Sequence, residues 1–563
     1  MSIIGIDLGT TYSLVSVWKD GKATIIPNSL GNNFTPSIVS IDEDNSILVG
    51  EVAKERLITH PNLTVSNFKR FMGTDKEFNL GSHVLSATDL SSLILKSLKR
   101  DAESFLGEEV TEAVISVPAY FNDSLRKATK IAGELAGLKV ERLISEPTAA
   151  AISYGMHKAE NDTQFLIFDL GGGTFDVSIL ELFDNVMEVK SIAGDNYLGG
   201  EDFNNLLISY LLEKNDLYLE SLNDKNISTL HKEAESCKRS ISKYSKGNMK
   251  LNIDSSNYEL TIDSDTFEKI CNELLLKLKT PIYWAMRDAD ISTDELDAVI
   301  LIGGSTKMTF IRSTVSRIFK TLPFSNINPD EAVAIGAAIQ AGLKERNEDL
   351  KEMILTDVCP YSLGVAIGKK QNNSYIGDFF SPIIDRNSPI PISKSEIYTT
   401  IHDYQKEIII DIYQGERMNV NENIKLGTMS INIPPKLAGE ELVDIRFTYD
   451  INGLLEVEAT SIETGVRKSI LIEKSPGSMS KEEIAERLKE LEKLKIHPKD
   501  ELENRLIIAR GERLYEESLG EKRNFIENLL INFQYTLNTQ NLKQISIERK
   551  KLTDIFNELE CEI

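Results

Sequence analysis

A strand–turn–strand pattern occurs twice in the first third of this chain. In the first copy, residues 3–18, an apolar run leads into Asp-Leu-Gly-Thr-Thr at residues 7–11 and continues into a second apolar run. In the second copy, residues 165–180, the corresponding turn is Asp-Leu-Gly-Gly-Gly-Thr at residues 169–174. A repeated supersecondary unit of this kind predicts two lobes of similar build that face each other across a cleft.

Each of these turns has the composition of a phosphate-binding site. Glycine lets backbone N–H groups approach phosphate oxygens closely, and threonine hydroxyls add further donors. The aspartates suit a hydrated Mg²⁺, which bridges carboxylates to phosphates. A single turn of this type is equally well explained as an ordinary hairpin. Two copies, together with a third Gly-Gly-Ser-Thr turn at residues 303–306, predict a nucleotide site between the lobes.

The pattern of apolar residues, and with it the expected secondary structure, changes along the chain. We expect a two-lobed α/β nucleotide-binding region at 1–347, an interdomain linker at 348–358, an antiparallel β-sandwich at 359–475, and a short helical region at 476–563. The linker is charged apart from one apolar island, Met353-Ile354-Leu355. The last segment opens with a capping box at 480–483 and continues into three further helical patterns, at about 500–519, 521–537 and 540–559, typical of a short α-helical bundle.

Charge and composition exclude several other classes of protein. A net charge of -24 argues against binding a nucleic-acid backbone. The four scattered cysteines match neither a disulfide framework nor a metal knuckle. No apolar run is long enough for a membrane helix, and the first residues lack the pattern of a secretory signal. A cytoplasmic protein that binds neither nucleic acid nor membrane is therefore expected.

The chain resembles the DnaK-type heat shock protein 70 chaperones over nearly its whole length. The resemblance is carried by the turns at 4–11 and 169–176, by Val-Pro-Ala-Tyr-Phe-Asn-Asp at 117–123, by Ser-Glu-Pro-Thr-Ala-Ala-Ala at 145–151, and by Leu-Gly-Gly-Glu-Asp-Phe at 198–203. The shortened outline is most similar to the HscC branch. This resemblance implies an α/β two-lobed actin-like ATPase at 1–347 and a reduced helical lid at 476–563. It also implies an ATP-dependent chaperone that hydrolyses ATP, binds exposed apolar segments of unfolded proteins, and works with a J-domain co-chaperone.

The resemblance also implies a role for particular residues, with ATP or ADP, Mg²⁺ and K⁺ as ligands. Asp7, Asp169 and Asp176 hold the metal ions, and Lys69, Glu146, Thr174 and Asp169 form the catalytic set. The nucleotide contacts are Gly9, Thr10, Thr11, Tyr12, Gly171, Gly172, Gly173, Thr174, Gly200, Glu201, Glu235, Lys238, Arg239, Ser242, Gly303, Gly304, Ser305, Lys307 and Asp330. Lys307 replaces an arginine that stacks on the base in many relatives, which predicts weaker adenine stacking. Outside the family context, Lys69 is more simply read as a solvated surface lysine and residues 235–242 as a charged helix face.

Two further groups of residues are implied in coupling and peptide binding. The coupling residues are Pro118, Arg126, Arg142, Met353, Ile354, Leu355 and Asp357, of which Arg142 and Asp357 contact the J-domain partner. The peptide cleft is formed by Leu363, Val365, Tyr398, Ile401, Ile408 and Ile410. Ordinary surface charges and an ordinary sandwich core are the alternatives for these two groups.

Two alternative functions use the same ATPase lobes. A small-molecule kinase needs a general-base aspartate between the lobes, and an actin-like filament protein would end soon after Ala341; residues 360–563 argue against both. Relative to longer family members, the stretch Met72–Val84 is short and Ser245–Lys250 is a brief turn. Because such elements brace the closed cleft, we expect ADP to leave quickly without a GrpE-type exchange factor.

Overall fold

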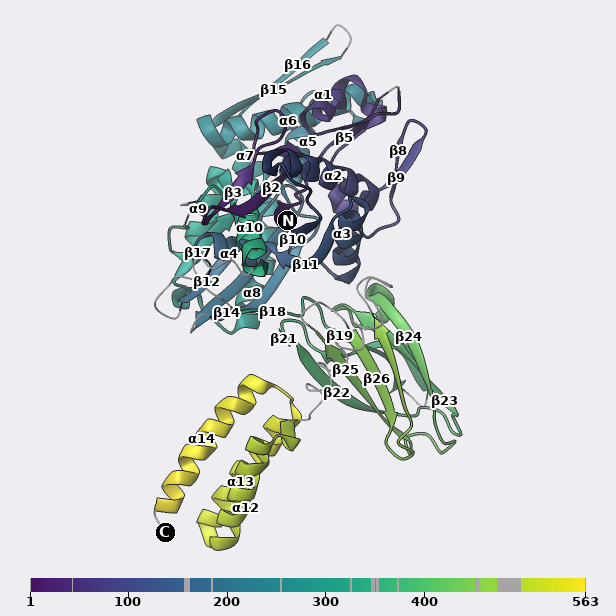
Figure 1. Ribbon diagram of the computed structural model, residues 1–563, viewed down its shortest axis with the longest axis vertical. Coiled ribbons are helices and arrows are strands. Elements are labelled where there is room, and N and C mark those ends of the chain that lie inside the picture. The colour runs from purple at the N-terminus through teal and green to yellow at the C-terminus, as the bar shows by residue number, and fades with distance from the viewer. Residues whose placement is uncertain are drawn as a thin grey trace. The chain divides into compact units, whose positions relative to one another are not determined.

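The computed structural model in Figure 1 describes the chain except for residues 1, 43, 156–162, 184–185, 254–255, 325–326, 346–349, 351–353, 372–373, 451–454, 473–497 and 562–563. It divides into two compact units. Unit 1 is residues 1–361 together with 386–389, and unit 2 is residues 362–385 together with 390–563. The predicted start of the helical lid, including the capping box at 480–483, lies outside the described residues.

The first sheet of unit 1 is built around the first of the two repeated turns. β1 (Ile4–Asp7) pairs antiparallel with β2 (Tyr12–Lys19) and parallel with β10 (Glu112–Val117). β11 (Lys139–Ser145) and β3 (Lys22–Ile26) extend this sheet at its two ends, and β4 (Thr35–Pro36) also pairs with β2. Smaller strands of the same region are β5 (Val39–Ile41), β6 (Ile47–Val49), β7 (Thr64–Val65), β8 (Glu77–Leu80) and β9 (His83–Ser86).

The second sheet repeats this plan around the second turn. β12 (Thr163–Leu170) pairs antiparallel with β13 (Phe175–Phe183) and parallel with β17 (Ala298–Ile302), and β14 (Val186–Asp195) continues beyond β13. Each turn therefore joins the two strands of a hairpin whose first strand also has a parallel neighbour. The repeat in the sequence corresponds to a repeat in strand topology.

Two helices pack tightly where the two sheets meet. A Cβ placed on Gly336 of α10 (Ala332–Lys344) would lie 1.8 Å from the carbonyl oxygen of Ala149 in α4 (Glu146–Ser153). Ser16 in β2 donates a hydrogen bond of 2.7 Å to the carbonyl of Ala334. The remaining helices of unit 1 are α1 (Glu51–Thr59), α2 (Ala87–Leu106), α3 (Asp123–Leu135), α5 (Gly200–Lys214), α6 (Asp224–Tyr244), α7 (Ser264–Ile270), α8 (Asn272–Ala289) and α9 (Thr309–Phe319).

One prediction about unit 1 is wrong. Residues 245–250 are not a brief turn, because β15 (Lys246–Ile253) already starts there and pairs antiparallel with β16 (Ser256–Asp263). Gly247, Met249 and Leu251 alternate with exposed residues and are buried, so one face of this hairpin packs into the core that also contains α6. Figure 1 shows the hairpin extending from one end of unit 1 beside α6.

Unit 1 also includes two segments from beyond residue 347. β18 (Ile354–Val358) pairs in parallel with β14 through Val186↔Ile354 and Glu188↔Thr356, and thus adds a strand to the second sheet. In the insert 386–389, Arg386 Nε donates to Asp288 Oδ2 at 2.8 Å and Asn387 Nδ2 donates to the same oxygen at 3.1 Å. The backbone N–H of Ile192 donates to Asn387 Oδ1 at 3.0 Å. Four residues from the β-rich part of the sequence thus complete unit 1.

The described residues of unit 2 form two antiparallel four-stranded sheets and three α-helices. The first sheet has the order β20-β19-β23-β24 and the second β22-β25-β26-β27. Their strands are β19 (Leu363–Gln371), β20 (Ser374–Ile384), β22 (Ile392–Thr399), β23 (Glu407–Gln414), β24 (Ile424–Asn432), β25 (Leu442–Tyr449), β26 (Leu455–Ser461) and β27 (Arg467–Ile472); β21 (Pro389–Ile390) begins with the last residue of the insert. The helices α12 (Leu502–Glu517), α13 (Gly520–Asn538) and α14 (Leu542–Cys561) share an apolar core that includes Leu514, Phe533 and Phe556. No helix in the described part of the chain is both long and apolar enough to span a membrane.

Candidate functional site

The two repeated turns face each other in unit 1. A Cβ on Gly172 would lie 2.1 Å from Thr11 Oγ1, and one on Gly173 would lie 2.9 Å from Thr10 Oγ1. Glycine is therefore required at 172 for the second turn to approach the first this closely. Backbone N–H groups and threonine hydroxyls of the two turns are brought together here, which is the donor set that a phosphate chain needs.

Acidic side chains from several elements gather behind these turns. Asp169 and Asp176 lie directly opposite each other on β12 and β13. The backbone N–H of Tyr120 donates to Asp176 Oδ1 at 3.1 Å, and Ser116 Oγ donates to Asp7 Oδ1 at 3.0 Å. Asp7 and Asp169 lie at the ends of β1 and β12, and Asp176 lies at the start of β13, each beside a phosphate turn, which explains why the fold places them together.

Lys69 and Glu146 complete this acid cluster. Lys69 lies in the 3₁₀ turn Phe68–Phe71, and Glu146 is the first residue of α4. Lys69 Nζ is 3.5 Å from Glu146 Oε1, and only 5% of the lysine side chain is exposed. Its ammonium group also lies 5.5 Å from the ring centre of Phe121. Lys69 is therefore a buried cation of the cluster, and the reading of a solvated surface lysine is wrong.

The surroundings of the three aspartates disfavour their ionised form and raise their pKa values. Burial, and then the charge of Glu146, raise the pKa of Asp7 to about 7. The same two causes raise the pKa of Asp176 to about 8, and burial with the charges of Glu146 and Asp176 raises the pKa of Asp169 well above its usual value. Asp169 Oδ2 and Asp176 Oδ2 are buried and accept no hydrogen bond. Such a cluster is stabilised by a cation.

These acids fit Mg²⁺ in its hydrated form. In the described part of the chain, no three His, Cys, Asp or Glu side chains are arranged to hold a metal ion by themselves. Mg²⁺ usually keeps several of its waters and takes one or two carboxylates together with substrate phosphates. The two unpaired carboxylate oxygens next to the phosphate turns match that pattern.

The third turn and α6 enclose the other end of the same site. Ser305 Oγ donates a hydrogen bond of 2.8 Å to the carbonyl of Gly171, which ties the third turn to the second phosphate turn. Lys238 Nζ donates one of 2.8 Å to the carbonyl of Gly200, which ties α6 to the start of α5. Glu235 forms ion pairs of 2.7 Å with Lys238 and with Arg239. These contacts place the residues expected around ribose and adenine beside the phosphate turns.

Further side chains lie at this end of the site. Arg239 Nη2 donates to the hydroxyl of Tyr12 at 3.2 Å, and its guanidinium lies 5.6 Å from the centre of that ring. Lys307 pairs with Asp330, whose carboxylate would also meet a Cβ on Gly304. Glu201 accepts hydrogen bonds from Asn204, and it pairs with His231 at 2.8 Å. Ser242 Oγ donates to the carbonyl of Lys238, one turn earlier in α6, at 2.9 Å.

The coupling candidates lie between the acid cluster and β18. Arg126 is buried and donates from Nε to the carbonyl of Phe121 at 3.0 Å, three residues after Pro118. Burial lowers the pKa of Arg142, and the negative charge of Asp357 in β18 opposes that shift. Met353 lies outside the described residues; Ile354 and Leu355 belong to β18.

The peptide candidates lie in unit 2 and differ in exposure. Leu363, Val365 and Ile410 are buried, Tyr398, Ile401 and Ile408 are half-buried, and Ile409 on the opposite face is exposed. Tyr398 donates to Ser381 Oγ at 3.1 Å, and burial raises its pKa to about 12. β19 pairs with β23 only from Leu363↔Gln414 to Val365↔Ile412 in the described strands. Beyond Val365, the described residues of β19 are not paired with β23.

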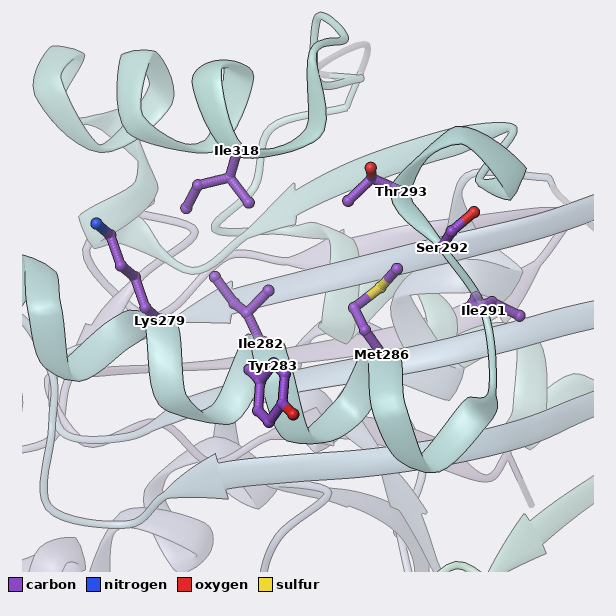
Figure 2. Close-up of a pocket in the computed structure, with 8 residues that line it drawn as sticks. All are labelled: Lys279, Ile282, Tyr283, Met286, Ile291, Ser292, Thr293 and Ile318. Atoms are coloured by element: carbon purple, nitrogen blue, oxygen red, sulfur yellow. The ribbon is translucent and has the colours of Figure 1, made fainter.

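Sequence reasoning missed several residues near the cleft. Arg70, next to Lys69, donates hydrogen bonds to Gly173, Tyr197 and Asp202. The ring of Tyr361 packs against that of Tyr120 at a tilt of 40°, with ring centres 4.5 Å apart. The one signal for Arg70 was its position beside Lys69. An apolar hollow of about 370 Å³, lined by α8, α9 and residues 291–293, lies elsewhere in unit 1 and contains none of the candidate catalytic residues (Figure 2).

A comparison with known protein families agrees with this geometry. The family model described as Hsp70 protein matches the chain over residues 3–560.

Proposed function

The chain belongs to the Hsp70 family, whose members are ATPases and ATP-dependent chaperones, and we propose that ATP binding and hydrolysis switch its affinity for apolar peptides through β18. Family members use ATP and ADP with Mg²⁺, bind unfolded clients and work with J-domain co-chaperones. The observation that carries the proposal is the pairing of β18, at the end of the expected linker, with the sheet that contains the second phosphate turn. We further propose the boundaries 1–347, 348–358, 359–475 and 476–563 for the four domains, and the HscC branch as the closest affiliation.

The catalytic role that we propose rests on Lys69, on the buried acids Asp169, Asp176 and Glu146, and on the partly buried Asp7. Mg²⁺, when bound, neutralises charge on the phosphates, and K⁺ is the further cation that we propose for this acid-rich centre. Phosphoryl transfer needs positioning and cations rather than a covalent nucleophile. Lys69 orients the attacking water and stabilises charge on the γ-phosphate, while Glu146 holds Lys69 in place at 3.5 Å. Asp7, Asp169 and Asp176 hold the hydrated ions, and Thr174 with Thr10 and Thr11 lines the phosphates.

The coupling that we propose runs from the acid cluster to β18. Asp176 accepts a hydrogen bond from Tyr120, and Tyr120 accepts one from the hydroxyl of Tyr361, three residues after β18. Arg126 bonds to carbonyls in the same loop. A change at the nucleotide can therefore reach the end of β18 through a short series of contacts. A bistable element of this kind is what converts nucleotide state into movement.

The peptide site that we propose lies where β19 and β23 part. Backbone groups of two diverging strands are available to an extended peptide, and the neighbouring apolar side chains supply a pocket. Val365 and Ile410 flank this point, and Tyr398 is held by Ser381. Selection would depend on exposed apolar segments rather than on one sequence.

The proposal also concerns partners. Arg142 in β11 and Asp357 in β18 form the J-domain contact that we propose, and the charge of Asp357 acts on the guanidinium of Arg142. We propose that ADP leaves without a GrpE-type exchange factor, because the stretch 72–84 is shorter than in longer family members and Lys307 replaces a stacking arginine.

Peptide-stimulated ATP turnover tests this function. Steady-state hydrolysis is measured with an unfolded apolar peptide, with a sugar, and over a range of protein concentrations. Stimulation by the peptide alone supports the chaperone cycle. Stimulation by the sugar would support a kinase, and dependence on protein concentration alone would support a filament-forming ATPase.

A further inference from the structure

Arg70 joins the two lobes of unit 1 beside the phosphate turns. Its Nη2 donates to Asp202 Oδ2 at 2.6 Å and to the carbonyl of Tyr197 at 2.7 Å, and its Nε donates to the carbonyl of Gly173 at 3.3 Å. Only 13% of the Arg70 side chain is exposed. One guanidinium therefore binds three acceptors that belong to the second phosphate turn and the residues around the start of α5.

These acceptors form one connected piece of the second lobe. Asp202 also accepts a hydrogen bond of 2.7 Å from the backbone N–H of Gly199, which caps α5. A Cβ on Gly199 would lie 2.5 Å from the backbone nitrogen of Gly173, so the cap and the phosphate turn are in close contact. The backbone N–H of Glu201 donates to the carbonyl of Gly172 at 2.9 Å. A side chain that is hydrogen-bonded to both Asp202 and Gly173 therefore fixes the position of the second phosphate turn relative to α5.

Arg70 itself is anchored in the first lobe. It follows Lys69 in the 3₁₀ turn Phe68–Phe71, and Phe68 is fully buried in the core of that lobe. Neighbouring residues of one rigid turn therefore present two cations in different directions. Lys69 points to Glu146 and the acid cluster, and Arg70 points to the opposite lobe.

We propose that Arg70 is a positioning residue that fastens the second phosphate turn to the first lobe and so keeps that turn in register with Lys69. The inference rests on the phosphate cradle proposed above and adds a residue that acts on it. Arginine is suited to this task because its planar fork has five donors, whereas lysine offers a single ammonium group. Opening the cleft requires all three hydrogen bonds to break, so Arg70 affects both the alignment for hydrolysis and the release of ADP.

The test measures two rate constants in the full-length chain. Single-turnover hydrolysis of preloaded ATP reports the chemical step, and stopped-flow release of a fluorescent ADP analogue reports opening. For Arg70→Ala we expect hydrolysis about tenfold slower and ADP release about tenfold faster, each equivalent to about 1.4 kcal/mol. Arg70→Lys should fall between Arg70→Ala and the wild type in both rates, because it keeps the charge but loses the fork.

A second substitution separates positioning from general loss of structure. Asp202→Asn keeps an acceptor for the Gly199 N–H but removes the charge that Arg70 contacts, and the double variant should be no worse than Arg70→Ala. Contacts that act together give such non-additive effects. Partial unfolding would lower the amplitude of the single turnover and leave its rate constant unchanged. If Arg70→Ala does not fold, the same two rate constants measured in Arg70→Lys and in Asp202→Asn test the inference instead.

The matched control is Arg317→Ala, which removes an exposed arginine ion pair of 3.2 Å with Glu268, both within the second lobe. Its two rates should equal those of the wild type. Wild-type rates in folded Arg70→Ala, or fully additive effects of Arg70→Ala and Asp202→Asn, would overturn the inference. Failure of the proposed chaperone function would appear instead as wild-type protein that does not respond to peptide.

Discussion

Replacing Lys69 by alanine removes the buried cation paired with Glu146 in the catalytic cluster. Its ammonium lies 3.5 Å from Glu146, and two unit charges at that distance attract by about 5 kcal/mol at an effective permittivity of about 20. A preorganised charge that acts mainly in the transition state contributes about 100- to 1,000-fold to the rate, or about 2.7–4 kcal/mol. We therefore expect Lys69→Ala to lower single-turnover hydrolysis by that factor.

Binding of nucleotide should change much less in the same variant. The cradle consists largely of backbone and threonine groups from the two turns, which the substitution leaves in place. Hydrolysis is measured by single-turnover chemistry and affinity by equilibrium titration with ADP and ATP. The matched control is Lys250→Ala, which removes an exposed lysine pair with Glu259 on the β15–β16 hairpin. Equal losses of affinity and hydrolysis in Lys69→Ala would refute the transition-state role.

Three other outcomes are expected. Thr174→Val should slow single-turnover hydrolysis less than Lys69→Ala does, because one hydroxyl is lost while the backbone donors remain; an unchanged rate removes Thr174 from the site. Ile410→Asp should abolish binding of a fluorescent apolar peptide, because an unpaired carboxylate replaces a residue that is only 2% exposed. The control Ile409→Asp changes a residue that is 64% exposed, and this variant should bind the peptide normally. Equal affinities in both folded variants would show that Ile410 has no part in the pocket. ADP release should be fast without any exchange factor, and slow release that a GrpE-type factor strongly accelerates would contradict this.

Local sequence patterns predicted the two strand–turn–strand repeats and the last three helices well. Each Asp-Leu-Gly turn lies between two strands of a hairpin, because the apolar runs and the glycines are read from neighbouring residues. The three C-terminal helices likewise follow from their periodicity. The hairpin that starts at Lys246 was predicted to be a brief turn, because Gly247 and Asn248 are common in turns. The packing of one face of β15 against α6 is a contact that these two residues do not indicate.

Contacts between distant residues could not be predicted in this way. Arg70 and Asp202 are 132 positions apart, and neither carries a local signal of the other. The pKa values of Asp7 and Asp176 depend on burial and on Glu146, which is brought near them only by the complete fold. The sequence thus indicated which residues belong to the candidate site, whereas the fold determines which of these charged residues influence one another.

The insert 386–389 has a practical consequence for any fragment of this protein. A polypeptide cut after Tyr361 keeps every phosphate turn but lacks Arg386 and Asn387, the partners of Asp288 and of the Ile192 N–H. Removing Arg386 returns the pKa of Asp288 toward its ordinary value, because the guanidiniums of Arg386 and Arg287 outweigh the burial that would raise it. Hydrolysis rates and melting temperatures of such a fragment therefore describe a molecule in which Asp288 of α8 and the Ile192 N–H of β14 have lost these partners. Grafting the tetrapeptide back through a flexible connector would give a more faithful minimal ATPase.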